Sequence, residues 1–167
     1  VYTEHPRVIE GMIEIYGSWI DKFGVDGFRI DTAQHVNPEF WQKFVPAMLE
    51  RARAKGIPNF HIFGEVATSE MDPAHTAVNT RVDKLPSILD FAFTRAVVDT
   101  VAGKAGTDEL AKLFRADPLY EGGAAAAARN PTFLGNHDAG RFPVLLKMFG
   151  FKGDDAELLK RDMLGHA

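Results

Sequence analysis

The sequence predicts an α/β fold in which helices alternate with parallel strands. Apolar residues recur at three- and four-residue steps in several segments, which is the spacing of amphipathic helices. Short apolar runs lie between these segments and end in polar turns, as strands do, and Gly or Pro stops the helices. This alternation is typical of βαβ units.

The first half of the chain contains two predicted helices and two predicted strands. A helix is expected over residues 8–23, followed by a strand over 25–31. Asn37 before Pro38 is typical of a helix start, so a second helix is expected over 38–52. The second strand is expected over 60–66.

The second half is predicted with the same alternation. Residues 67–84 are polar and read as irregular, and the alanine-rich stretch 122–128 reads as a flexible approach or a fraying turn. The predicted elements are a strand over 87–91, a helix over 94–101, a helix capped by Thr107 that reaches about residue 114, a strand over 132–136 and a helix over 154–164.

Composition excludes several classes of protein. The chain has 167 residues, 46% of them hydrophobic, which is enough for one globular domain with a sizeable core. The net charge of -4 gives no reason to expect nucleic acid as a partner. No apolar run is long enough to span a membrane, and the absence of cysteine excludes disulfides and thiolate metal sites.

Acidic residues stand at the ends of three predicted strands. They are Asp31, Glu65 and Asp138, and Arg29 shares a strand face with Asp31. Each acid alone fits a cap or turn, and Arg29 with Asp31 alone fits a structural ion pair. Together they lie where α/β barrels keep their active sites, at the carboxyl ends of parallel strands.

Two carboxyl groups that face a sugar acetal can hydrolyse a glycosidic bond, because one attacks the anomeric carbon while the other protonates the leaving oxygen. Asp31 beside Arg29 fits the ionised role, since a nearby cation favours the charged form. Glu65 lies between Gly64 and Val66, and we expect apolar surroundings that favour its protonated form.

Three segments resemble motifs of the α-amylase superfamily, glycoside hydrolase family 13. Residues 27–35 (GFRIDTAQH) resemble the strand of the nucleophile, and 63–66 (FGEV) resemble the strand of the acid/base. Residues 133–138 (FLGNHD) resemble the motif that stabilises the transition state. The three occur in the order of the family, and Leu89-Asp90-Phe91 stands where the intervening strand is expected.

The resemblance implies roles for individual residues. Asp31 would form the covalent glycosyl intermediate, Glu65 would protonate the leaving group and Asp138 would brace the distorted sugar. Arg29 would orient Asp31, and His137 would hydrogen-bond the sugar at the cleavage point.

Two features depart from the family pattern. Gln34 stands where many starch-acting relatives have Lys, so the contacts on the aglycone side and the subfamily stay open. The family motif that supplies a substrate His and a calcium-binding Asn is absent from the chain. His35 matches a position whose backbone carbonyl often binds that calcium, so calcium is one implied ligand, and an ordinary loop histidine is the alternative.

The resemblance favours a retaining hydrolase of α-1,4-linked glucans such as starch or maltooligosaccharides. One alternative is a glucanotransferase of the same family, which differs only in what accepts the sugar. A non-catalytic binding subunit would be expected to have lost the three acids, and a barrel enzyme with Mg²⁺ on these acids fits their sequence contexts less well.

The resemblance also implies that residues 1–167 are a fragment of the catalytic domain, about strands 4 to 7 of a (β/α)8 barrel with their helices. Four strands are only half of such a barrel, so we expect weak activity of the fragment alone. They also leave open edges that can pair with another chain, so we expect self-association through these edges. A secreted or periplasmic location would be typical of the family.

Overall fold

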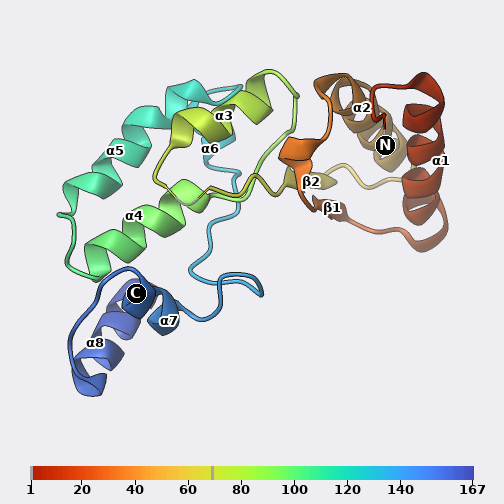
Figure 1. Ribbon diagram of the computed structural model, residues 1–167. Coiled ribbons are helices and arrows are strands. Elements are labelled where there is room, and N and C mark those ends of the chain that lie inside the picture. The colour runs from red at the N-terminus through yellow and green to blue at the C-terminus, as the bar shows by residue number, and fades with distance from the viewer. Residues whose placement is uncertain (1, 69) are drawn as a thin grey trace.

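The computed structural model describes residues 2–68 and 70–167 (Figure 1). Its helices and strands, in chain order, are α1 (Pro6–Phe23), β1 (Gly27–Ile30), the 3-10 turn η1 (Ala33–His35), α2 (Pro38–Ala54), β2 (His61–Gly64), α3 (Pro73–Arg81), α4 (Phe91–Val101), α5 (Asp108–Ala116), the 3-10 turn η2 (Asp117–Leu119), α6 (Ala124–Ala127), α7 (Phe142–Met148) and α8 (Asp155–His166). None of the described helices is long and apolar enough to cross a membrane.

The elements form two groups that the sheet region connects. In Figure 1, α1 and α2 lie together beside β1 and β2, whereas α3 to α6 lie on the opposite side and α7 and α8 lie below α4. One core packs α1, α2 and the two strands, with Ile20, Met48 and Ile62 fully buried. A second, smaller core joins α4 to α7 through Val98 and Leu146.

Helix α1 ends and α2 begins where the sequence predicts, but α1 begins two residues earlier and α2 ends two residues later than predicted, and the side chain of Asn37 makes no capping hydrogen bond. Pro6 and Pro38 stand at the first position of α1 and α2, where the missing N–H costs nothing. Gly24 ends α1 in the left-handed conformation, with φ 62°, which residues with a Cβ adopt at a cost. Arg51 of α2 crosses α1 at Gly17 and pairs with Asp21 at 2.9 Å.

The sheet has two parallel strands, and the first two strand predictions are confirmed with trimmed ends. Phe28 lies opposite Ile62, and Arg29 lies opposite Phe63. Gly27 lies so close to the carbonyl of His61 that a Cβ there would clash. The parallel register places the carboxyl ends of β1 and β2 side by side, so the residues that follow them are neighbours.

The strands predicted over 87–91 and 132–136 are wrong, because the chain there makes only isolated hydrogen bonds. Leu89 N donates to Gly64 O at 2.9 Å, and Asp90 N donates to Pro131 O at 3.0 Å. The side chain of Asp90 accepts a hydrogen bond from Phe93 N and so caps α4. This helix therefore begins within the range predicted for the third strand. Pro131 has no N–H to donate to a ladder, and Thr94 Oγ1 occupies the carbonyl of Phe133.

These extended segments nevertheless keep the expected order in space. Hydrogen bonds connect β1 to β2, β2 to residues 87–89, and Asp90 to Pro131. The sequence order of the four predicted strands is therefore their spatial order, although two of them are too short to form strands.

Three smaller corrections concern helices. Residues 73–81 form α3, with Asp72 as its side-chain cap, where an irregular segment was predicted; Ser69 of that segment lies outside the described residues. The short helix α7 follows residue 141 and was not predicted. Thr107 precedes α5 but its side chain makes no capping hydrogen bond, since its backbone is already helical with φ -66° and ψ -10°.

Candidate active site

Arg29 joins the two acids that follow β1 and β2. Its Nη1 donates to Asp31 Oδ1, and its Nη2 lies 3.0 Å from Glu65 Oε1. The ion pair of Arg29 with Asp31 was expected because the two residues share a strand face. The parallel register of β1 and β2 brings Glu65 to the same guanidinium. A planar guanidinium with two donors can hold two carboxylates at once in fixed positions.

These neighbours stabilise the positive charge of Arg29. The hydrogen bond to Asp31 raises the pKa of the guanidinium above its ordinary value; desolvation opposes this, and the charges of Glu65, Asp31 and Asp138 reinforce it. Asp138 therefore lies close enough to act on the same cation, although it belongs to a segment more than 100 residues away in sequence.

Glu65 is buried, with 8% of its surface exposed, and its surroundings differ from the prediction. Apolar surroundings were expected, yet Arg29 contacts one carboxylate oxygen and Thr32 N donates to the other at 3.1 Å. The expectation was wrong because the turn after β1 folds back toward Glu65. Glu65 N also donates to Ile30 O at 2.8 Å, and Ala33 N donates to Glu65 O at 3.0 Å.

Asp138 is held by a local turn and not by a strand. Asn136 Oδ1 accepts from Asp138 N at 3.0 Å and from Ala139 N at 2.7 Å. The side chain of Asp138 is 63% exposed and lies 3.2 Å from Nε2 of His137, which is itself 74% exposed. The position of Asp138 thus depends on Asn136, which the sequence did not mark as a functional residue.

A cavity of about 240 Å³ brings most of the predicted residues together. It is lined by Thr32, Gln34, His35, Glu65, Ala67, Phe91, Asn136, Asp138 and Ala139. Gln34 Nε2 reaches Ala67 O at 3.5 Å, which is a weak contact. Phe91 gives the cavity an aromatic wall that the sequence did not suggest, because residue 91 was assigned to a strand.

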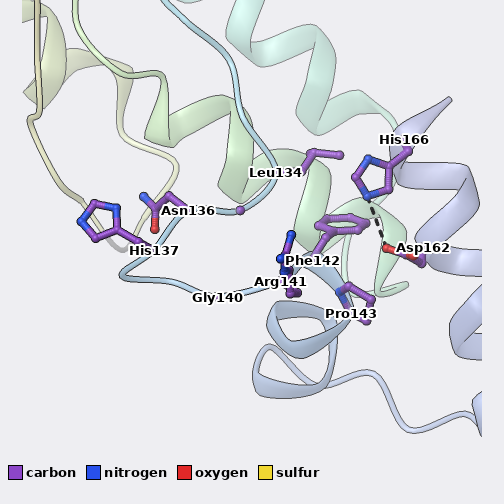
Figure 2. Close-up of a pocket in the computed structure, with 10 residues that line it drawn as sticks. Leu134, Asn136, His137, Gly140, Arg141, Phe142, Pro143, Asp162 and His166 are labelled. Atoms are coloured by element: carbon purple, nitrogen blue, oxygen red, sulfur yellow. Dashed lines mark ion pairs between the residues drawn. The ribbon is translucent and has the colours of Figure 1, made fainter. Parts of the chain in front are cut away.

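The remaining predicted residues lie just outside this cavity. Arg29 and Asp31 line an adjacent groove of about 310 Å³ between β1, α1 and α2, and the Asp31 side chain is 68% exposed. His137 lines a cavity of about 850 Å³ on the other side of the Asn136 loop. Figure 2 shows Asn136 and His137 at one end of that cavity and the His166–Asp162 pair at the other. The three acids therefore lie along one open edge and not within one closed pocket.

Metal binding has little support from side chains. Within residues 2–68 and 70–167, no group of three or more His, Asp or Glu side chains could hold a metal ion. Calcium takes six to eight oxygen ligands. The backbone carbonyl of His35 would supply one of them, so a calcium site through His35 stays a prediction.

The contact between the backbone N–H of Thr32 and Glu65 was not predicted from the sequence. The side chain of Thr32 makes no capping hydrogen bond, and its contribution is a backbone N–H in a left-handed turn with φ 48°. Since Thr usually avoids this conformation, residue type alone predicts an ordinary extended or helical residue here.

Comparison with known proteins gives consistent matches. Residues 1–162 match the family model for the catalytic domain of α-amylase. An α-amylase of Streptomyces lividans is 40% identical over 166 residues, which are 99% of this chain and 18% of that protein. A cyclomaltodextrinase of a Bacillus species is 31% identical over 97 residues, which are 58% of this chain and 15% of that protein.

Solved structures give the same result. An α-amylase of Geobacillus thermoleovorans, crystallised with acarbose, superposes with a TM-score of 0.73 and 26% identity over 90% of this chain and 32% of that chain. The chain thus spans less than a fifth of the length of these two curated relatives and about a third of this structure.

Proposed function

The chain belongs to the α-amylase catalytic domain family, and from this premise we propose that it carries the catalytic centre of a retaining glycoside hydrolase. The proposed substrates are α-1,4-linked glucans such as starch and maltooligosaccharides. The chain would be a fragment of a (β/α)8 barrel, with β1 and β2 as strands 4 and 5 and the extended segments near Ile88 and Phe133 as strands 6 and 7.

The observation that supports this proposal most is the contact of one guanidinium with two carboxylates at the ends of neighbouring parallel strands. A retaining mechanism needs two carboxyl groups about 5–5.5 Å apart, so that one attacks the anomeric carbon while the other protonates the leaving oxygen. Arg29 contacts both Asp31 and Glu65, which holds the two carboxylates near one another. Asp138 lies within electrostatic reach of the same guanidinium.

The proposed reaction has two steps. Asp31 Oδ bonds to the anomeric carbon while the glycosidic C–O bond breaks, and Glu65 gives its proton to the departing oxygen. Glu65 then takes a proton from water, whose oxygen attacks the anomeric carbon and releases Asp31. Asp138 would stabilise the positive charge that develops on the sugar ring between these states.

The other residues would bind the sugar. Gln34 and His35 line the cavity beside Glu65, and His137 adjoins Asp138. Their side chains offer hydrogen-bond donors and acceptors on both sides of the cleavage point. If a second sugar and not water takes the glycosyl group, the same residues would make the protein a glucanotransferase.

The decisive experiment is product analysis with the complete protein on maltooligosaccharides and starch. Proton NMR of fresh product should show the α-anomer first, since two inversions retain configuration. Release of the β-anomer would contradict the retaining mechanism, and longer oligosaccharides in place of shorter ones would identify a transferase.

Variants of the two acids test the assignment of roles. Asp31→Asn should prevent formation of the glycosyl intermediate. Glu65→Gln should lower kcat by about 10²–10⁴-fold on natural glucans but much less on substrates with good leaving groups, which need little protonation. Glu50→Gln, on the exposed side of α2, is the matched control. Equal, modest losses for both substrate types would contradict the acid/base role of Glu65.

We also propose that the fragment associates with itself, because one edge of the sheet is open. In the described part of the chain, no strand pairs with the second edge of β1, and an apolar groove lined by Met12, Tyr16 and Phe40 runs beside it. A second copy could add a strand there. Sedimentation of the 167-residue chain over a range of concentrations would detect such a dimer.

A further inference from the structure

We propose that Thr32 is a positioning residue whose backbone N–H holds the carboxylate of Glu65 in place for proton transfer. The inference deepens the proposed function, because it rests on Glu65 as the acid/base. It concerns the residue directly after the proposed nucleophile, so the chain segment that carries the nucleophile would also set the position of the acid.

The first argument is the backbone conformation of Thr32. Its φ of 48° and ψ of 36° lie in the left-handed region, which a β-branched residue adopts at a cost. Among the described non-glycine residues, positive φ occurs only at Thr32 and Lys84. Such a conformation persists where surrounding contacts fix it, and it often marks a functional position.

The second argument is that the neighbouring contacts do fix this turn. His35 N donates to Thr32 O at 3.0 Å, and Ala33 N donates to Glu65 O at 3.0 Å. Ala33 is fully buried, and its carbonyl accepts the indole N–H of Trp41 at 3.1 Å. The turn is therefore held by β2, by η1 and by α2 at the same time.

The third argument is the direction of the N–H. Thr32 N donates to Glu65 Oε2 at 3.1 Å, while Arg29 Nη2 contacts Oε1 at 3.0 Å. Each carboxylate oxygen thus has its own donor, and both donors come from the segment that begins with β1. The left-handed turn also directs the next residue, Ala33, back to Glu65, whose carbonyl accepts the N–H of Ala33 at 3.0 Å, so the segment is held against Glu65 on both sides of the contact.

Removal of this one N–H is the direct test. In the complete protein, threonine 32 is replaced by its α-hydroxy acid, so that an ester replaces the amide and the donor is lost. We expect a roughly 10- to 100-fold loss of kcat on natural glucans, the usual effect of one lost hydrogen bond to a charged group. On substrates with good leaving groups the loss should be much smaller, since these need less help from Glu65.

The matched control is the same ester replacement at Ala33. The N–H of Ala33 donates to the main-chain carbonyl of Glu65 and not to the carboxylate. Its loss should weaken the turn without changing the ratio of kcat between the two substrate types. The same ratio in both ester variants would overturn the proposal, whereas a wild-type protein that cleaves no glucan would overturn the proposed function instead.

A second measurement needs no altered backbone. With threonine-selective ¹⁵N labelling, the amide proton resonance of Thr32 should move with pH as its carboxylate acceptor ionises. Arg29, Asp31, His35 and Asp138 are further ionisable groups near this site, so the Glu65→Gln variant must be measured in parallel. Movement that is clearly smaller in Glu65→Gln than in the wild type supports the proposal, and the same movement in both proteins contradicts it.

Discussion

The part of the site at the ends of β1 and β2 and the part in the turn at Asn136 are built differently, although both carry proposed catalytic acids. Asp31 and Glu65 follow strands whose register is fixed by a hydrogen-bonded ladder and by a core of large aromatic side chains. Asp138 follows a segment that forms no strand, and a single asparagine shapes its turn. The acids on strands are positioned by long-range packing, whereas the third acid is positioned by local hydrogen bonds.

This difference predicts unequal sensitivity to substitution. Changes near the strands should affect two acids together, because Arg29 contacts both of them. Changes near Asn136 should affect Asp138 alone. Four substitutions test the contrast, from the largest expected effect to the smallest.

The largest effect is expected from Arg29→Lys. A lysine keeps the positive charge but has no planar pair of donors, so it cannot hold Asp31 and Glu65 in one geometry. We expect a loss of about 2–4 kcal/mol in transition-state stabilisation, which is roughly a 30- to 900-fold loss in kcat/KM of the complete protein. Activity within a few-fold of wild type would show that the two acids are positioned independently of Arg29.

The packing of the first core is tested by Gly17→Ala in α1. A Cβ at this position would clash with the guanidinium of Arg51, which would have to leave Asp21, 2.9 Å away. The better helix propensity of alanine offsets part of this cost, so we expect a net loss of about 1 kcal/mol in the free energy of unfolding, measured by denaturant titration.

Gly11→Ala in the same helix is the control for Gly17→Ala. A Cβ at Gly11 would meet nothing within 4 Å, so alanine there should stabilise α1 by up to about 1 kcal/mol through its better helix propensity. A loss of stability in both variants would mean that the contact with Arg51 is not the cause.

The turn of the third acid is tested by Asn136→Ala. The substitution removes the acceptor of Asp138 N and Ala139 N, which should cost about 1 kcal/mol in the free energy of unfolding. We expect kcat to fall more than KM rises, because the role proposed for Asp138 is to stabilise the transition state. Asn136→Asp keeps an acceptor and should retain the turn, so equal instability of both variants would disprove its local origin.

The smallest effect concerns the pH dependence of stability at Asp83. Burial raises the pKa of Asp83 above its ordinary 3.8, against the hydrogen bond from Asn79. As pH rises from this ordinary value, the unfolded chain loses a proton that the folded protein still binds, so the free energy of unfolding decreases. Asp83→Asn should make this decrease smaller.

The decrease should not vanish in Asp83→Asn, since burial also raises the pKa of Asp90. Asp155→Asn, whose side chain is 96% exposed, is the control and should keep the slope of the wild type. Unfolding measured by denaturant at several pH values would check both variants. An unchanged slope in Asp83→Asn would mean that Asp83 titrates alike in the folded and unfolded states.

The contrast between the halves also explains what the sequence could predict. The period-two pattern of residues 27–31 and 61–65 was sufficient to place Arg29 and Asp31 on one face and Glu65 on the same face of the next strand. In the second half the same reasoning failed. Pro131 has no N–H for a ladder, and the hydroxyl of Thr94 donates to the carbonyl of Phe133. The contact of Thr94 joins segments 39 residues apart, so a local pattern does not contain it.

The residues of the candidate site could be proposed from the sequence, but their detailed contacts could not. The three acids, Gln34 and His35 follow from the motifs, and the structure places them along one edge. The turn that brings Thr32 to Glu65 depends on a backbone conformation that is rare for its residue type. Backbone contacts of this kind leave no trace in residue identity.

Gly64 shows how this arrangement limits change by protein engineering. A Cβ on Gly64 would lie 2.8 Å from the Cβ of Ala33 and 2.9 Å from Cδ1 of Leu85, so the turn after β1 and the segment after α3 meet at this point. A larger residue at position 64 would require both Ala33 and Leu85 to move or to be replaced by smaller residues at the same time. At position 33 the only smaller residue is glycine. Directed evolution that accepts one substitution at a time should therefore leave this point untouched and alter substrate preference through Gln34, His35 and Phe91 at the cavity wall.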